Sequence, residues 1–168
     1  MFRIMKNLFR LRRPLGLLAI ALPVAVAACS LKSDAIAPTI IVPIESTTFE
    51  PTLGVDLAHS TKTANGVYIR DITVGTGTVA APGVTMTVRY VGRLSNGAVF
   101  DSTTTNPFTF TLGVTNLIAG WTEGVAGMKV GGSRQLIIPP SMGYGSAYVG
   151  AVPPNSILVF RVDLIGAQ

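Results

Sequence analysis

The most regular pattern in the chain is an alternation of apolar and polar positions over residues 85–94. The apolar positions of one set are Met86, Val88, Tyr90 and Leu94. Successive side chains of a strand point to opposite faces, so this pattern predicts a strand with one buried face. Asn96-Gly97 follows as a turn signal, since both residue types tolerate positive φ. Residues 98–102 are then expected to return as the partner strand.

Shorter apolar segments bounded by glycine or proline predict further strands over 67–72, 108–112 and 134–138 and a last strand around 158–164. One segment differs, because residues 118–125 carry apolar side chains at the spacing of one helix face. Gly120 and Gly124 lie within it, so this short helix must depend on packing rather than on propensity. The sum is an α+β fold with one core, an antiparallel sheet of about five strands and one short helix.

The N-terminal 28 residues have a different pattern. Basic residues end at Arg13, and residues 15–28 are apolar but too few to span about 30 Å of hydrocarbon as a helix. A basic head with a short apolar run predicts a secretory signal peptide over 1–28. Its end, Val26-Ala27-Ala28-Cys29, resembles the bacterial lipobox, which implies lipidation of Cys29. The alternative is an ordinary secretory signal that leaves a free cysteine.

The lipobox reading predicts an exported, membrane-anchored lipoprotein that faces the periplasm, on the inner leaflet of the outer membrane in a Gram-negative host. Several acyl chains anchor a protein stably, whereas one does so only marginally. Residues 29–62 are rich in proline, serine and threonine and show no sustained apolar period, which predicts a flexible tether. Ile40, Ile41 and Val42 are an alternative edge strand within it.

Charge and composition exclude several function classes. The net charge is +5, but five of the 13 basic residues precede residue 14, so the remainder is near neutral and no nucleic-acid partner is expected. His59 is the only histidine and Cys29 the only cysteine. This disfavours histidine-based metal sites and Cys/His nucleophiles, and neither a metal nor another cofactor is expected.

Five motifs in order along residues 63–168 carry a family resemblance. They read RYVGRLSNGAVFDS (89–102), PFTFTLG (107–113), LIAGWTEGVAGMKVGG (117–132), IIPPSMGYGS (137–146) and VPPNSILVFRVDLI (152–165). This stretch resembles an FKBP-type peptidyl-prolyl cis-trans isomerase domain. The resemblance implies a half-wrapped antiparallel sheet over a short helix, with the substrate proline bound between them.

The resemblance also assigns site residues. The expected catalytic set is Tyr90, Phe100, Asp101, Trp121, Tyr144 and Phe160, with Trp121 as the floor, Asp101 as a buried aspartate and the Tyr144 hydroxyl as a donor. The expected substrate-binding set is Phe108, Leu117, Ile118, Tyr148 and Val152, with the Ile118 backbone N–H as a further donor. Proline-containing polypeptides are the implied substrates and macrolide immunosuppressants the implied inhibitors.

The chemistry suits such residues. Rotation about a prolyl amide faces a barrier of about 18–20 kcal/mol, and no bond is broken. A dry aromatic pocket stabilises the twisted, less polar amide better than the planar one. The chain departs from the family at the uncharged loop 102–106, which leaves Asp101 to find hydroxyl or tyrosine partners, and at Asn116 and Ala151.

The predicted function is therefore a membrane-tethered isomerase that accelerates X–Pro isomerisation while extracytoplasmic proteins fold. One alternative is a non-catalytic module of the same fold that binds proline-containing partners. Another is a holdase that acts through exposed apolar surface.

Overall fold

The computed structural model describes residues 41–103 and 105–168. The chain divides into two units, Met1–Ala37 and Pro38–Gln168, and every described residue belongs to the second. The predicted signal peptide, the lipobox with Cys29 and the first part of the predicted tether lie outside the described residues. Within the part of the chain that the structure describes, no helix is long and apolar enough to cross a membrane.

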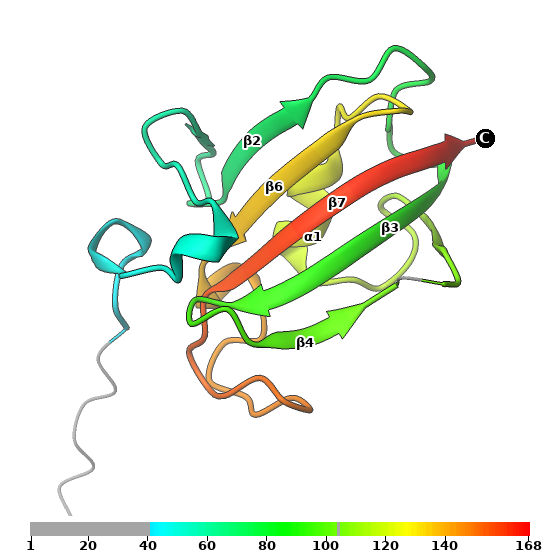
Figure 1. Ribbon diagram of the computed structural model, residues 1–168. Helices are drawn as coiled ribbons and strands as arrows, with labels where there is room; N and C mark the ends of the chain where they lie inside the picture. The colour runs from blue at the N-terminus through cyan, green and yellow to red at the C-terminus, as the bar shows by residue number, and fades with distance from the viewer. Residues whose placement is uncertain (1–40, 104) are drawn as a thin grey trace, which may run out of the picture. The chain divides into compact units, whose positions relative to one another are not determined.

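A single antiparallel sheet forms the body of this unit (Figure 1). Its strands are β1 (Thr61–Lys62), β2 (Tyr68–Thr73), β3 (Thr85–Leu94), β4 (Val99–Ser102), β5 (Phe108–Thr111), β6 (Ser133–Ile138) and β7 (Leu158–Ala167). The order across the sheet is β1-β2-β6-β7-β3-β4, and β5 also pairs with β3. The helical elements are α1 (Ala119–Val125) and the 3-10 turns η1 (Ile44–Ser46), η2 (Pro51–Leu53) and η3 (Pro140–Met142).

The long alternating strand has the predicted bounds, and its buried side chains include Met86 and Val88. The turn after it differs in detail from the prediction. Gly97 takes a positive φ of 87°, but Asn96 does not. Asn96 instead accepts a hydrogen bond from the backbone N–H of Ala98 through its side-chain oxygen, at 3.1 Å. The hairpin therefore needs left-handed backbone at one position only.

The short helix α1 lies behind β6 and β7 in the view of Figure 1, and its two glycines explain how it holds there. A Cβ atom on Gly120 would lie 2.4 Å from Cγ2 of Ile138, and one on Gly124 would lie 2.7 Å from the Cδ atoms of Leu136. Both glycines therefore face the sheet and allow the helix backbone to approach β6 closely. This fits the expectation that packing, not propensity, holds the helix.

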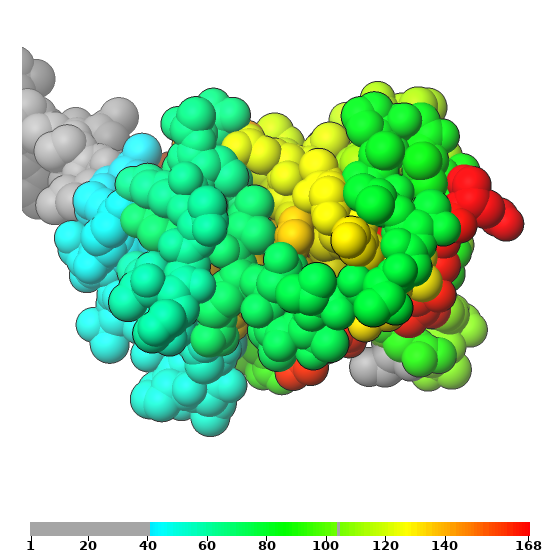
Figure 2. All heavy atoms as spheres, turned by 90° about the horizontal axis from the view of Figure 1, so that it is seen from above, coloured from blue at the N-terminus to red at the C-terminus, as the bar shows by residue number. Residues whose placement is uncertain are grey.

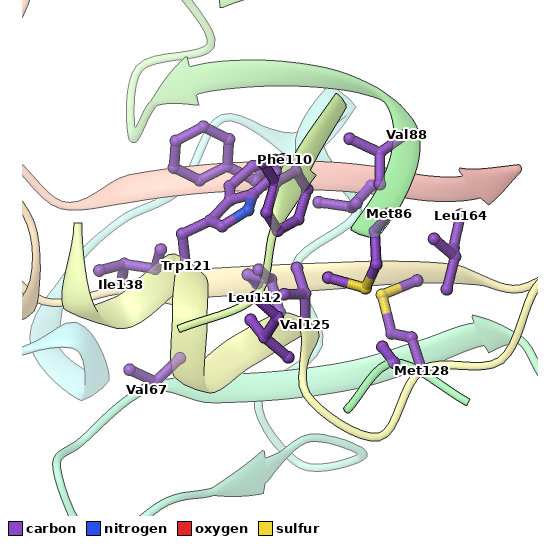
Figure 3. Packing of buried hydrophobic residues seen from close by; sticks show 14 of the residues in the cluster. Val67, Met86, Val88, Phe110, Leu112, Trp121, Val125, Met128, Ile138 and Leu164 are labelled. Atoms are coloured by element: carbon purple, nitrogen blue, oxygen red, sulfur yellow. The ribbon is translucent and has the colours of Figure 1, made fainter. Parts of the chain in front are cut away.

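The main core fills the space between α1 and the inner face of the sheet (Figure 3). Trp121 projects from α1 toward the strands beside Phe110, and Val125 extends the same helix face toward Leu112. All of these side chains are at most 4% exposed. Contacts with the core therefore fix the position and orientation of the Trp121 ring.

A second apolar cluster covers the opposite, outer face of the sheet. It joins Ile137 and Val159 of β6 and β7 to Ile44 and to partly buried residues of the preceding segment, including Phe49 and Leu53. We call residues 43–60 the strap. Figure 2 shows its cyan spheres directly against the rest of the described chain. Because both faces of β6 are covered, all six of its residues are buried.

The strap differs from the flexible tether expected over 29–62. Its backbone is pinned at several points: Glu50 N–H donates to Ser95 O at 2.9 Å, and Gln135 Nε2 donates to Leu53 O at 2.7 Å. The apolar residues of the strap follow no helix or strand period, which is why the sequence pattern did not reveal their packing. Burial against the sheet, rather than any local period, orders this segment.

Candidate active site

A cavity of about 500 Å³ opens on the inner side of the sheet, where α1 meets β3, β4, β5 and β7. This volume lies within the usual range of small-ligand pockets. Its lining residues are Tyr90, Asp101, Phe108, Asn116, Leu117, Ile118, Trp121, Tyr144 and Phe160. Most of the predicted site residues therefore come together around one hollow, although they are spread over 71 positions of the chain from Tyr90 to Phe160.

The floor of the cavity is a set of aromatic rings in edge-to-face contact. The ring centroids of Tyr90 and Trp121 lie 5.0 Å apart with an interplanar angle of 74°, and those of Trp121 and Phe160 lie 5.1 Å apart at 82°. Phe108 adds a further edge contact to Tyr90 at 6.1 Å. Such pairs favour one ring arrangement over others, so the cavity keeps an apolar, preformed shape.

Glycine 92 makes this arrangement possible. A Cβ atom there would lie 2.7 Å from Cζ of Phe100 and 2.8 Å from Cε1 of Phe160. Phe100 is not among the residues that line the cavity; its ring packs edge to face against Phe160 with centroids 5.4 Å apart. The catalytic role predicted for Phe100 stays a prediction, and in the structure Phe100 contacts a lining residue. Gly92 itself was missed, although a glycine within the long alternating strand signals a close approach.

The polar side of the cavity centres on Asp101. The Tyr90 hydroxyl donates a hydrogen bond to Asp101 Oδ2 at 2.5 Å, which matches the expected tyrosine partner. The expected burial of Asp101 is wrong, because this residue lies exposed on β4 at the end of the sheet order and meets the open cavity. Its carboxylate is therefore available to the solvent-filled space where a ligand would sit.

Two tyrosines act as potential donors in the cavity. Burial, followed by the hydrogen bond to Asp101, raises the pKa of Tyr90 well above its usual range. Burial also raises the pKa of Tyr144, with a smaller contribution from the Asp101 charge. Both phenols therefore stay protonated near neutral pH and can donate. The Tyr90 hydroxyl is engaged by Asp101, and Tyr144 makes no side-chain hydrogen bond to any other described residue.

The loop that was expected to border the cavity differs in part. Val152 is 2% exposed and belongs to the main core, because mutual backbone hydrogen bonds with Val149 form a tight turn that directs it inward. Tyr148 is 70% exposed and does not line the cavity. Neither residue is among those that line the hollow, and their substrate-binding role stays a prediction. Asn116, noted only as a departure from the family, is a lining residue.

One supporting residue was missed altogether. Arg134 of β6 is 8% exposed and forms two hydrogen bonds with Asp71, at 2.7 and 3.0 Å. Its Nη1 also donates to the carbonyls of Gly124 and Ala126, at 2.9 and 3.0 Å. The guanidinium thus binds the C-terminal end of α1, the helix that carries Trp121. The sequence signal that could have revealed it is that Arg134 alternates with Leu136 and Ile138, so the strand pattern places this arginine on the buried face.

Residues capable of holding a metal ion do not gather in the described ranges, where no group of three or more His, Cys, Asp and Glu side chains forms such a cluster. The cavity instead offers aromatic surface, hydroxyl donors and one carboxylate. The backbone N–H of Ile118, at the N-cap of α1, donates to no acceptor in the described part of the chain. Chemistry that needs shape and donors, rather than a nucleophile, suits this set of groups.

Comparison with known proteins gives one consistent family. A family model described as FKBP-type peptidyl-prolyl cis-trans isomerase matches residues 77–165, more than half of the chain. FK506-binding protein 4 of Neurospora crassa is 50% identical over 105 residues, which cover 62% of this chain and 22% of that protein. Peptidyl-prolyl cis-trans isomerase FKBP53 of Arabidopsis thaliana is 49% identical over 109 residues, covering 62% and 23%. The chain spans about a quarter of the length of these curated relatives.

Solved structures agree with the predicted fold. The crystal structure of FkpA from Escherichia coli matches with a TM-score of 0.61 and 37% identity, covering 66% of this chain and 52% of that one. The crystal structure of AtFKBP13 matches with a TM-score of 0.61 and 36% identity, covering 65% and 98%. The predicted α+β fold, an antiparallel sheet with a single short helix, is confirmed.

The predicted localisation is contradicted by the same comparisons. The curated relatives named above are eukaryotic, and a further one, 49% identical over 104 residues, is a 46 kDa FK506-binding nuclear protein of Spodoptera frugiperda. These relatives point away from a periplasmic, membrane-anchored lipoprotein. The expectation was drawn from residues 1–29 alone, whereas these matches cover about three fifths of the chain.

Proposed function

The chain belongs to the FKBP-type peptidyl-prolyl cis-trans isomerase family, and from this membership we propose that its aromatic cavity accelerates cis-trans isomerisation of X–Pro bonds in polypeptides. The observation that carries the proposal is the floor of Tyr90, Trp121 and Phe160, whose rings meet edge to face and form an apolar bed for a proline ring. We assign the isomerase domain to residues 63–168, with the strap as a packed extension of it.

The apolar floor acts on the electronic character of the amide. The planar prolyl amide owes its barrier of about 18–20 kcal/mol to C–N resonance, which separates charge that water stabilises. A proline ring seated on Trp121 carries its amide out of water and removes this stabilisation from the planar state. The twisted state loses less, so the cavity binds the transition state more tightly than the ground state.

The polar groups orient the substrate. The Tyr144 hydroxyl makes no side-chain hydrogen bond within the described ranges, and burial raises its pKa, so the protonated phenol is suited to donate to a substrate carbonyl. Ile118 also lines the cavity, and its N–H offers a second donor. Asp101 lines the same cavity and is fixed by the Tyr90 hydroxyl at 2.5 Å. Two donors and one fixed carboxylate set the direction in which a bound dipeptide lies, and no proton needs to be transferred.

Macrolides of the FK506 type are the inhibitors that we expect for this cavity, in line with the names of its relatives. Such ligands occupy an apolar hollow with a few oriented donors. Ala151, where a larger aliphatic residue is common in the family, is exposed and is not among the residues that line the cavity. A macrolide that competes with an X–Pro peptide would place both ligands in the same cavity.

The test is isomerisation of an X–Pro peptide by residues 38–168, which form the compact unit. We expect clear acceleration, a large loss with Trp121→Ala and a smaller loss with Tyr144→Phe, because the phenol contributes one hydrogen bond of about 0.5–1.5 kcal/mol. Tyr148→Phe serves as the matched control, since Tyr148 is 70% exposed and lies outside the cavity lining. Binding of the peptide without acceleration would instead show a non-catalytic module.

A further inference from the structure

A second cavity, of about 420 Å³, lies between the strap and the outer face of the sheet. We call it the outer groove. Its lining residues are Thr52, Leu53, Gly54, Arg70, Ile72, Val91, Arg93, Gln135, Val159 and Arg161. None of these residues lines the aromatic cavity, which opens on the other side of the same strands. The proposed isomerase function makes no use of this groove.

Strand register explains why arginines gather there. Arg70 of β2 pairs with Gln135 of β6, Gln135 pairs with Arg161 of β7, and Arg161 pairs with Val91 of β3. These four residues form one row across four neighbouring strands, so their side chains share the outer face. Arg93, two residues after Val91, lies on this face as well and diagonally across from Arg161.

The three arginines differ in how far they are already engaged. Arg70 donates to Gly54 O at 2.7 Å and lies 3.9 Å from Asp56, so it mainly holds the strap. Arg93 donates from Nη1 to Gly97 O at 3.0 Å. Arg161 lies 3.8 Å from Asp163, and its side chain is 61% exposed. Arg161 and the remaining N–H groups of Arg93 are therefore the donors open to a ligand.

The balance of charge on this face favours an anion. Three guanidiniums, those of Arg70, Arg93 and Arg161, line the groove, and no acidic residue is among its lining residues. The carboxylates lie at its edges: Asp56 beside Arg70, Asp163 beside Arg161, and Glu50 beside Gly97. Guanidinium groups bind carboxylates through paired hydrogen bonds, which are stronger than hydrogen bonds between neutral groups.

The apolar part of the lining narrows the class of anion. Val91, which is half-buried, and Ile72, which is 43% exposed, lie among the arginines, whereas Val159 is already covered by the strap. A phosphate ion would satisfy the guanidiniums alone and leave Val91 and Ile72 uncovered. A nucleic acid requires an uninterrupted cationic stripe, and here two aspartates interrupt it. A peptide that carries both carboxylates and aliphatic side chains matches both parts of the lining.

We propose that the outer groove binds an extended acidic peptide segment, with carboxylates on Arg93 and Arg161 and aliphatic side chains against Val91 and Ile72. Spacing supports this pairing. Diagonal neighbours on adjacent strands lie about 7–8 Å apart. Residues i and i+2 of an extended peptide share one face and lie about 6.5–7 Å apart. Two glutamates at alternate positions therefore reach the two guanidiniums together.

The experiment measures binding of a labelled, proline-free peptide, Val-Thr-Glu-Thr-Glu-Thr-Val, to residues 38–168 by fluorescence anisotropy at low salt. We expect saturable binding that weakens about tenfold with Arg161→Gln, because a charge-assisted contact is lost. Arg93→Gln should weaken binding similarly. Arg161→Gln is the variant less prone to disturb folding, because the Arg161 side chain is exposed and its ion-pair partner, Asp163, lies 3.8 Å away. The peptide with glutamine at both glutamate positions should not bind.

Arg89→Gln is the matched control. Arg89 carries the same charge on the same face and strand but does not line the groove. Binding that is equally weakened by Arg89→Gln and Arg161→Gln would reveal a general charge effect and overturn the proposal. Absence of peptide binding, with binding of inorganic phosphate or an oligonucleotide instead, would also overturn it. Because the readout is binding of a proline-free peptide, the result is independent of isomerase activity.

Discussion

Replacing Gly120 with alanine tests the claim that close approach to β6 holds the helix in place. In an unconstrained helix this change stabilises by about 1 kcal/mol, because glycine has the greater backbone entropy to lose. Here the new Cβ would lie 2.4 Å from Cγ2 and 3.1 Å from Cγ1 of Ile138, which is 0% exposed. Overpacking of this kind costs about 1–3 kcal/mol. We therefore expect net destabilisation of up to about 2 kcal/mol.

The assay is urea unfolding of residues 38–168, with the free energy of unfolding compared in two backgrounds. In the wild-type background Gly120→Ala should destabilise. Ile138→Ala alone should cost about 2–5 kcal/mol, because it removes a fully buried side chain. In that background the atoms that clash with the new Cβ are gone, so Gly120→Ala should become neutral or stabilising. The change of sign between the two backgrounds is the diagnostic result.

Two outcomes would refute this reasoning. Stabilisation of the wild-type protein by the full helix-propensity gain would show that α1 has room to move away from the sheet at no cost. Equal effects in both backgrounds would show that the Ile138 side chain does not clash with the new methyl group, because substitutions at two contacting residues should give a coupling energy. Isomerase activity offers a second readout, since Trp121 follows directly in the chain and shifts with the helix.

Three further predictions concern the groups that hold the domain together. Arg134→Met removes the link from Asp71 to the C-terminal end of α1 and should lower the free energy of unfolding in urea by about 2–4 kcal/mol. This is less than for a fully buried ion pair, because the Asp71 side chain is 39% exposed. An unchanged unfolding midpoint would show that Arg134 does not hold the helix end. Hydrogen bonds from Lys62 and then Tyr68 lower the pKa of Glu45 from 4.5 to about 2. Glu45 therefore stabilises the fold above pH 4.5 and loses this contribution as the pH falls toward 2, so the unfolding free energies of wild type and Glu45→Gln should converge over this window. Truncation to residues 63–168 uncovers Ile137 and Val159, each worth about 1.5–3 kcal/mol, and should lower the midpoint; equal midpoints would show that the strap is dispensable.

The sequence by itself determined the parts of this protein that rest on local periodicity. The alternation over residues 85–94 gave a strand with the observed bounds, because side-chain direction in a strand depends only on position parity. The apolar spacing at residues 118–125 likewise located the helix. The ordered motifs identified the family and, with it, most residues of the aromatic cavity.

Only the tertiary structure decided features that depend on contacts between distant segments. The strap is ordered because it covers the outer face of β6, and no local pattern in residues 43–60 announces that burial. Asp101 is exposed because β4 ends the sheet order, and Val152 is buried because a turn with Val149 directs it inward. Arg134 acquires its role from carbonyls at the end of a helix that precedes it in the chain. Periodicity fixes which way a side chain points, but what it meets there is set by long-range packing.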